Sequence, residues 1–340
     1  MHRKRLVCLT TAAAVACMAT GVASASAATI TGAGSTLVQP LEALWAAGYA
    51  SSNTGNTVSY SGVGSGTGIT DITNGLVDFG ASDAPLSTTQ QAACPQCVQM
   101  PWALSATAVG FHLKGITSLD LSPKVLAEIY LGQITNWDNS AIKKLNKKVK
   151  LPNRKITVVY RSDGSGDTYA FSNYLYHVSS TWASKVGPPA TTISFPTGIS
   201  GKGNSGITAI LANTDGAIGY VAASYLIEQG GLGAIAVQNA AGNYEYPNLP
   251  NISAAAAAFP TIPANNAISI VDPPKSAKKA YPISTYTYVI VPKNTSDAGP
   301  LQSWISYALT TGQAFGAKLD FAPLPSAVVT AATNTLNSLS

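Results

Sequence analysis

Charged residues are scarce in this sequence, at 10% of 340 residues, whereas apolar residues make up 46%. That balance excludes a disordered chain, which has the opposite composition. Histidine is rare as well: beyond residue 28 only His112 and His177 occur, far apart and each more typical of a surface or core position than of a metal ligand. Nor does this part of the chain approach the roughly 18 consecutive apolar residues of a membrane span. We therefore expect no metal, no cofactor and no transmembrane helix.

The N-terminal segment has the pattern of an export signal. Residues 2–5 are basic, residues 6–21 are apolar and alanine-rich, and residues 23–28 are small. This order is typical of a cleaved signal peptide. Residues 1–28 are therefore predicted to be a signal peptide, and the protein to be periplasmic or on the cell surface. A short membrane anchor is the alternative, and lipid attachment at Cys17 is disfavoured because no bulky residue stands three positions before it.

Neither charge sign dominates after the signal. Three of the 20 Lys and Arg residues and none of the 15 Asp and Glu residues lie within residues 1–28, which leaves a net charge of +2. This excludes the basic footprint of a nucleic-acid-binding domain. The one basic cluster is interpreted as a solvated helix face and loop; it comprises Lys143, Lys144, Lys147, Lys148 and Lys150.

Cysteine is nearly absent from the rest of the chain. Apart from Cys8 and Cys17 in the signal, only Cys94 and Cys97 occur, in the order Cys-Pro-Gln-Cys. In a cytosolic protein this spacing would suggest a redox motif or half of a zinc site. In an exported protein a small structural disulfide is favoured.

Glycine-spaced turns are abundant instead. Three units of strand, Gly/Ser/Thr turn and helix are predicted at residues 30–45, 58–76 and 156–175, and Asp83 stands at a fourth strand end. Strands that alternate with helices indicate an α/β fold. Because helix starts present free N–H groups, such turns are typical of anion sites. The third turn also contains Arg161 with two acids, Asp163 and Asp167, and so favours an anion that still carries a proton.

The sequence contains no Pro/Ser-rich linker and no internal repeat. A two-domain chain without a linker suggests that the chain crosses between domains more than once. Strands are expected at residues 76–82, 106–112, 216–221 and 286–291, and helices within residues 121–142, 254–258, 301–309 and 328–339.

Together these motifs resemble the PstS family, the phosphate-binding proteins of the bacterial phosphate ABC transporter. The resemblance runs in family order from about residue 30 to the C-terminus. The matching pieces are residues 31–36 (TGAGST), 62–66 (GVGSG), 76–86 (LVDFGASDAPL), 129–132 (IYLG), 161–166 (RSDGSG), 201–204 (GKGN) and 216–221 (GAIGYV).

The resemblance implies a two-lobed periplasmic-binding-protein fold of type II-like topology. One lobe would comprise residues 29–110 and 282–340, and the other residues 111–281, with two crossover strands as the hinge. The ligand would lie in the cleft between lobes that close by hinge motion. It also implies a monomer that delivers phosphate to the permease and ATPase subunits of an ABC transporter.

Residue by residue, the resemblance implies a phosphate site from three turns and one strand end. Asp83 would accept a hydrogen bond from a protonated phosphate oxygen, and Arg161 would supply positive charge. Asp167 stands where many relatives have Thr; it would either accept a second proton or turn toward Arg161. The implied donors are Ser35, Thr36, Leu37, Ser65, Ser165 and Gly166.

The alternatives remain a binding protein for another oxyanion, such as sulfate or molybdate, a secreted phosphatase or esterase, and an adhesin or phosphate sensor on the same fold. Asp83 argues against sulfate, because a buried carboxylate repels an anion that brings no proton. An enzyme is disfavoured, because neither residues 64–66 nor 164–166 (both Gly-Ser-Gly) have the Gly-x-Ser-x-Gly spacing of a hydrolase.

Overall fold

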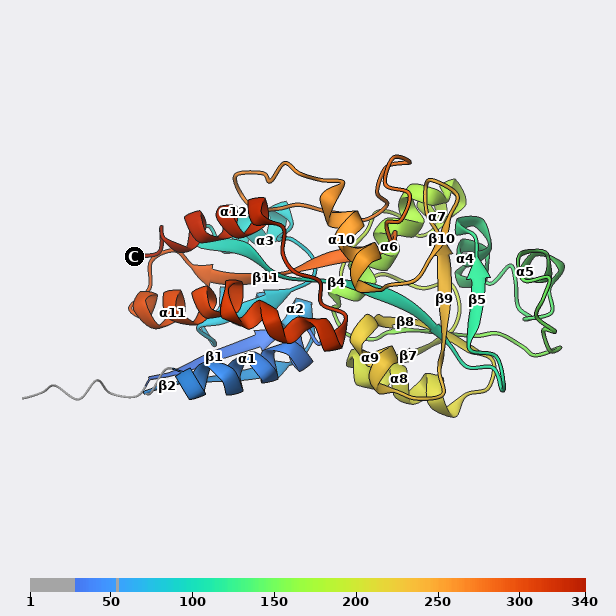
Figure 1. Ribbon diagram of the computed structural model, residues 1–340, viewed down its shortest axis with the longest axis horizontal. Coiled ribbons are helices and arrows are strands. Elements are labelled where there is room, and N and C mark those ends of the chain that lie inside the picture. Colours follow the sequence, from blue (N-terminus) through green and yellow to red (C-terminus); the bar gives the residue numbers. More distant parts are fainter. Residues whose placement is uncertain (1–27, 53–54) are drawn as a thin grey trace, which may run out of the picture.

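The computed structural model describes residues 28–52 and 55–340. Its elements form two α/β lobes that lie side by side along the long axis (Figure 1). The predicted signal peptide lies outside the described residues, apart from Ala28. Within the described ranges no helix has the length and apolar character needed to cross a membrane.

The first lobe is built on a mixed sheet in the order β2-β1-β3-β11-β4. β1 is parallel to β2 and β3, whereas β11 is antiparallel to β3 and β4. Its strands are β1 (Ala28–Gly34), β2 (Asn56–Gly62), β3 (Phe79–Ser82), β4 (Cys97–Phe111) and β11 (Ser284–Pro292). Its helices are α1 (Gln39–Ser52), α2 (Ser65–Thr73), α3 (Thr88–Ala93), α11 (Ala298–Leu309), the 3-10 helix η1 (Thr311–Leu319) and α12 (Ser326–Leu336).

The second lobe continues from the far half of β4. β8 pairs with β4 and β6, and β9 pairs with β4, β5 and β10. Its other strands are β5 (Ser118–Leu121), β6 (Thr157–Arg161), β7 (Ile199–Gly201), β8 (Ala217–Ala222), β9 (Gly233–Gln238) and β10 (Tyr244–Glu245). Its helices are α4 (Pro123–Tyr130), α5 (Ser140–Leu145), α6 (Gly166–Val178), α7 (Ser180–Lys185), α8 (Gly203–Asn213), α9 (Ala223–Glu228) and α10 (Leu249–Ala257).

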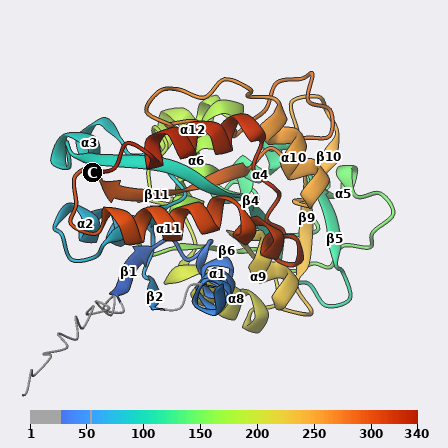
Figure 2. The ribbon, with the colours of Figure 1, turned by 60° about the vertical axis from the view of Figure 1, so that its left-hand side comes forward.

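Two strands connect the lobes. β4 pairs with β11 as far as Ala106, opposite Ser284, and then with β8 from Thr107, opposite Ala222. β4 and β11 run side by side between α11 and α12 (Figure 2). The chain therefore passes between the lobes without a separate linker, as expected from the absence of a linker composition. The lobe boundaries at residues 110/111 and 281/282 stay a prediction.

Most predicted elements are confirmed, and the differences have local causes. The helical region expected within residues 121–142 is divided into α4 and α5, because Gly132 follows α4 with a φ of 71° that ends the helix. The strand expected from residue 76 begins only at Phe79. The predicted disulfide is present, joining Cys94 and Cys97 just after α3.

Glu42 is an exception to the apolar lining of the first lobe. It lies on the buried face of α1 with Trp45 and is fully buried. Neither of its carboxyl oxygens has a hydrogen-bond partner among the described residues. Burial raises the pKa of Glu42 well above its usual value, which favours the protonated form in the folded protein.

Replacing Glu42 by methionine is expected to raise the free energy of unfolding by about 1–3 kcal/mol at pH 8, because an unpaired buried polar group costs that much. The folded state holds a proton that the unfolded state releases, so wild-type stability falls as pH rises above the unfolded pKa. The gain from Glu42→Met should therefore be larger at pH 8 than at pH 5. Urea unfolding at both pH values measures it.

The matched control is Glu128→Met, which removes a partly exposed carboxylate 3.8 Å from Lys124. Such a surface pair contributes about 0–1 kcal/mol. A Glu42→Met protein no more stable than wild type at pH 8 would show that Glu42 is not an unpaired acid.

Candidate functional site

Three helix starts meet where the lobes face each other. They are the turns before α1, α2 and α6, and each follows a parallel strand, as the glycine-spaced motifs predict. The amide of Gly66 donates to the carbonyl oxygen of Gly164 at 2.9 Å, and the amide of Gly166 donates to the Ser65 hydroxyl at 3.1 Å. Both bonds join the first lobe to the second, so the structure shows the lobes closed.

Glycine is required at this junction because the backbones touch. A Cβ atom on Gly66 would lie 3.0 Å from the Cα of Gly164. One on Gly166 would lie 2.4 Å from the Cβ of Asp83. Gly64 has a φ of 98°, which L-residues rarely adopt. The Gly-Ser-Gly turns thus allow the lobes to approach as far as they do.

Asp83 lies at the end of β3 and is almost completely buried. The Ser35 hydroxyl lies 2.7 Å from both carboxylate oxygens, and the Thr287 hydroxyl donates to Oδ1 at 2.7 Å. Burial, together with the charge of Asp167, raises the pKa of Asp83 to about 7, although the hydroxyl donors and Arg161 oppose the shift. This carboxyl can therefore gain or lose a proton near neutral pH.

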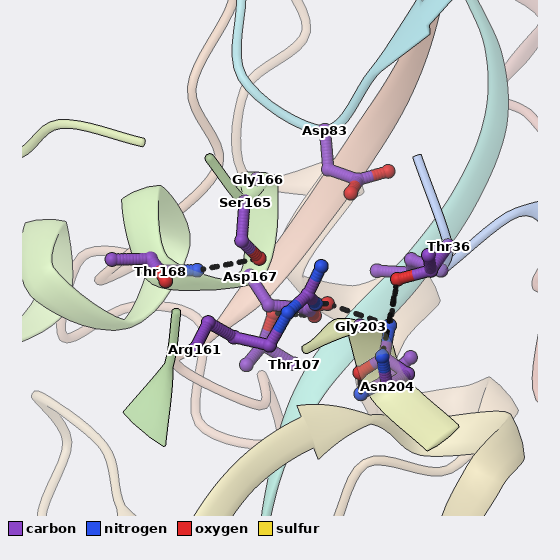
Figure 3. Close-up of polar contacts among 12 residues, drawn as sticks. Thr36, Asp83, Thr107, Arg161, Ser165, Gly166, Asp167, Thr168, Gly203 and Asn204 are labelled. Carbon is purple, nitrogen blue, oxygen red and sulfur yellow. Dashed lines mark hydrogen bonds and ion pairs between the residues drawn. The ribbon is translucent and has the colours of Figure 1, made fainter. Parts of the chain in front are cut away.

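Arg161 ends β6, and its buried side chain is paired with two acids, Asp163 and Asp167. Figure 3 shows it beside Asp167. Its Nε and Nη2 donate to the two carboxylate oxygens of Asp163, at 2.8 Å and 2.5 Å. Its Nη1 donates to Oδ2 of Asp167 at 3.1 Å. Three of the five guanidinium N–H groups are used in this way, which leaves two for a ligand. Arg161 also lowers the pKa of Asp163, although burial opposes it.

Asp167 turns toward Arg161, one of the two arrangements expected from the sequence. It is fully buried in the first turn of α6. Besides Arg161, it accepts hydrogen bonds from the Thr107 hydroxyl at 2.7 Å and from the Asn204 side-chain amide at 2.9 Å. Burial raises the pKa of Asp167, and these partners oppose the rise.

Asn204 also connects the lobes. Its Nδ2 donates to Oγ1 of Thr36 at 2.9 Å as well as to Asp167, and its Oδ1 accepts from the Ala222 amide at 2.9 Å. Thr36 thus contacts the second lobe through Asn204 (Figure 3).

Each of the three turns at the helix starts has a buried residue whose backbone amide has no hydrogen-bond partner within the described chain. These residues are Thr36, Ser65 and Asp167. Buried N–H groups are almost always paired, and an unpaired one costs about 1–3 kcal/mol. Together with the two remaining Arg161 donors, they form a donor-rich region around one proton-titrating carboxyl.

Other expected donors have partners within the protein. The Leu37 amide donates to the Ser35 hydroxyl at 3.0 Å. The Ser165 hydroxyl caps α6 by accepting from the Thr168 amide at 3.3 Å. The Gly166 amide is bonded to Ser65, as described above. Ser35 holds Asp83 in place in this structure.

Three members of the site were missed from sequence. Thr107 and Thr287 lie on the crossover strands β4 and β11, where a threonine is ordinary. Asn204 lies in the 201–204 motif, which is one of the pieces that resemble the PstS family. Its role, however, depends on contacts that are made only in the folded protein. No group of His, Cys, Asp and Glu in the described chain could hold a metal ion.

Comparisons with known proteins agree with this architecture. The family model of the PBP superfamily domain matches residues 20–311. The chain is 36% identical to the phosphate-binding protein PstS of Xylella fastidiosa strain Temecula1 over 301 residues, which covers 87% of this chain and 81% of that protein. It is 35% identical to PstS of Haemophilus influenzae over 312 residues, covering 90% and 91%.

Solved structures share the fold. A periplasmic phosphate-binding protein named PfluDING, bound with phosphate, superposes with a TM-score of 0.73 at 23% identity, covering 92% of this chain and 99% of that one. A phosphate-binding protein from Stenotrophomonas maltophilia gives a TM-score of 0.69 at 20% identity, covering 91% and 94%. The two-lobed α/β fold and the similarity over most of its length place this chain in the PstS family of phosphate-binding proteins.

Proposed function

We propose that this protein is an extracytoplasmic receptor that captures inorganic phosphate between its lobes and delivers it to a phosphate ABC transporter. The observation that supports this most is the unpaired donor set around Asp83. Neutral amides and one arginine can hold an anion without a basic cluster, and a carboxylate among them favours an anion that brings its own proton.

The proton provides the selectivity in this proposal. Phosphate near neutral pH carries at least one P–OH group, which can donate to an ionised Asp83. Sulfate is fully deprotonated and would place an oxygen against the carboxylate with no hydrogen between them. Because a charge left facing such an oxygen in a buried site costs several kcal/mol, Asp83 would discriminate by orders of magnitude.

The remaining residues would act in supporting roles. Thr36, Ser65 and Asp167 would donate their free amides, and Arg161 its two remaining N–H groups. Ser35, with Thr287, would hold Asp83, while Asp163 and Asp167 orient Arg161. Ser165, Gly166 and Leu37 would contribute donors once the lobes adjust around the ligand.

Delivery would require partners in the membrane. We propose that the exported monomer is recognised, when closed on phosphate, by permease and ATPase subunits. The lobes would be residues 29–110 with 282–340, and residues 111–281, hinged at β4 and β11.

A binding assay combined with a turnover assay tests the function. The purified protein should bind orthophosphate saturably by equilibrium dialysis, with one site per chain, and should release no phosphate from a generic phosphomonoester. Turnover would favour the phosphatase alternative, and tighter binding of molybdate or sulfate would favour another oxyanion.

Gly166→Ala is expected to weaken phosphate binding by about 10-fold to 100-fold, because overpacking costs about 1–3 kcal/mol. The new Cβ would lie 2.4 Å from the Cβ of Asp83 and hold the lobes apart. Small-angle scattering with saturating phosphate should show a larger radius of gyration than for wild type.

The control is Gly299→Ala, since nothing lies within 4 Å of a Cβ there. Its phosphate affinity and scattering should match wild type. A Gly166→Ala protein that binds and closes as wild type does would refute the close approach of the lobes at this point.

A further inference from the structure

The end of the second lobe carries a segment that is rich in positive charge. Residues 139–155 contain seven basic residues and no acid, among the 17 basic residues that follow residue 28. The segment comprises α5 and the loop after it, which project at the end of the molecule opposite the first lobe (Figure 1). A near-neutral protein thus carries a strongly basic tip.

Among the exposed lysines at and beside this tip, the following have no carboxylate within 4.0 Å in the described chain: Lys114, Lys144, Lys147, Lys148 and Lys150. Two other basic residues of the segment are paired with acids. Lys143 lies 3.6 Å from Asp138, and Arg154 lies 2.8 Å from Asp215. The unpaired lysines therefore form a positive field that the protein itself does not neutralise.

These lysines surround two adjoining hollows. One, of about 430 Å³, is lined by Lys144, Lys147 and Lys148. The other, of about 510 Å³, is lined by Lys114, Lys148 and Lys150. Lys148 lines both, together with Ser118 and Val149. The two hollows thus share part of their walls, and we call the two together the double hollow.

The loop that forms the hollows is anchored. The buried side chain of Asn146 accepts from the Asp120 amide at 2.8 Å and donates to the Asp120 carbonyl at 2.9 Å, which ties the end of α5 to β5. Asp120 is the one acid that lines either hollow. Burial raises its pKa. Ser118 and Tyr246 add hydroxyl groups to the wall.

We propose that this double hollow is a second anion site, which binds a linear polyphosphate-type polyanion. A single orthophosphate cannot contact five ammonium groups around two hollows, whereas a chain of phosphates can lie through both. Lysine suits such a ligand, because its ammonium is a mobile point charge that needs no fixed geometry. The proposal goes beyond the cleft between the lobes and does not rest on it.

The test is a titration of the full chain with a short linear polyphosphate, in saturating orthophosphate so that the cleft is occupied. Binding should weaken about 100-fold between 50 and 200 mM salt, as expected when about five phosphates are neutralised. The triple variant Lys147→Gln, Lys148→Gln, Lys150→Gln should lose about 10-fold or more in polyphosphate affinity and none in orthophosphate affinity.

The control is Lys275→Gln, Lys278→Gln, Lys279→Gln, which removes the same charge from an exposed segment elsewhere. It should bind polyphosphate as wild type does. Equal loss of affinity in both triple variants would show that only the net charge matters, which would contradict a defined site. Absence of polyphosphate binding by the wild-type protein would likewise overturn the site. Equal affinity for polyglutamate, or binding to anionic lipid vesicles in place of polyphosphate, would overturn the assigned ligand class.

Discussion

Replacing Asp83 by asparagine is expected to reduce the preference for phosphate over sulfate by about 100-fold or more, because the penalty for opposing a buried charge to an unprotonated oxygen is lost. Asparagine keeps the shape and can donate through its amide to a sulfate oxygen. Sulfate affinity should therefore rise while phosphate affinity falls, as measured by competitive titration at pH 8.

The pH dependence of sulfate binding provides a second test of the role of Asp83. The pKa of Asp83 is raised to about 7 by burial and the neighbouring Asp167. Below this pH the carboxyl is protonated and can donate to sulfate, so sulfate binding by wild type should strengthen as pH falls from 8 to 6. The Asp83→Asn protein should lack this dependence. Unchanged selectivity in the variant would remove Asp83 from its proposed role.

Replacing Arg161 by glutamine is expected to lower the free energy of unfolding by about 3–5 kcal/mol at pH 8 and to reduce phosphate affinity by at least about 100-fold. The arginine now pairs with Asp163 and Asp167, at 2.5 Å and 3.1 Å. Without it the partly buried carboxylate of Asp163 and the buried carboxylate of Asp167 lack their cation, so their pKa values should rise. The folded variant would then bind more protons than the unfolded chain, and the deficit should shrink as pH falls.

Arg154→Gln is the matched control for stability. It breaks an arginine–aspartate pair at 2.8 Å whose side chains are 53% and 40% exposed. Such a pair contributes about 0–1 kcal/mol. If urea unfolding gave the same change for Arg161→Gln as for this control, the buried network would have no role in holding the site together.

Local patterns predicted the turns well. The sequence places Thr36, Ser65 and Ser165 at helix starts because strand, glycine turn and helix follow one another within a few residues. The local pattern placed Asp83 at a strand end, and its role toward a ligand was implied only by the resemblance to the PstS family. These features depend on neighbours in the chain, which a sequence displays directly.

Contacts between distant segments were not predictable in the same way. Thr287 reaches Asp83 across 204 residues, and Asn204 reaches Thr36 across 168. Nothing in the strand around Thr287 distinguishes it from any other buried threonine. The use of the Leu37 amide within its own turn was equally hidden, because it depends on the rotamer that Ser35 adopts beside Asp83.

The most direct test of the account is calorimetric titration of the wild-type protein with phosphate and with sulfate at pH 8. The account predicts one phosphate per chain, bound at least about 100-fold more tightly than sulfate, since about 2.8 kcal/mol separates such affinities. Equal affinities for the two anions would contradict it.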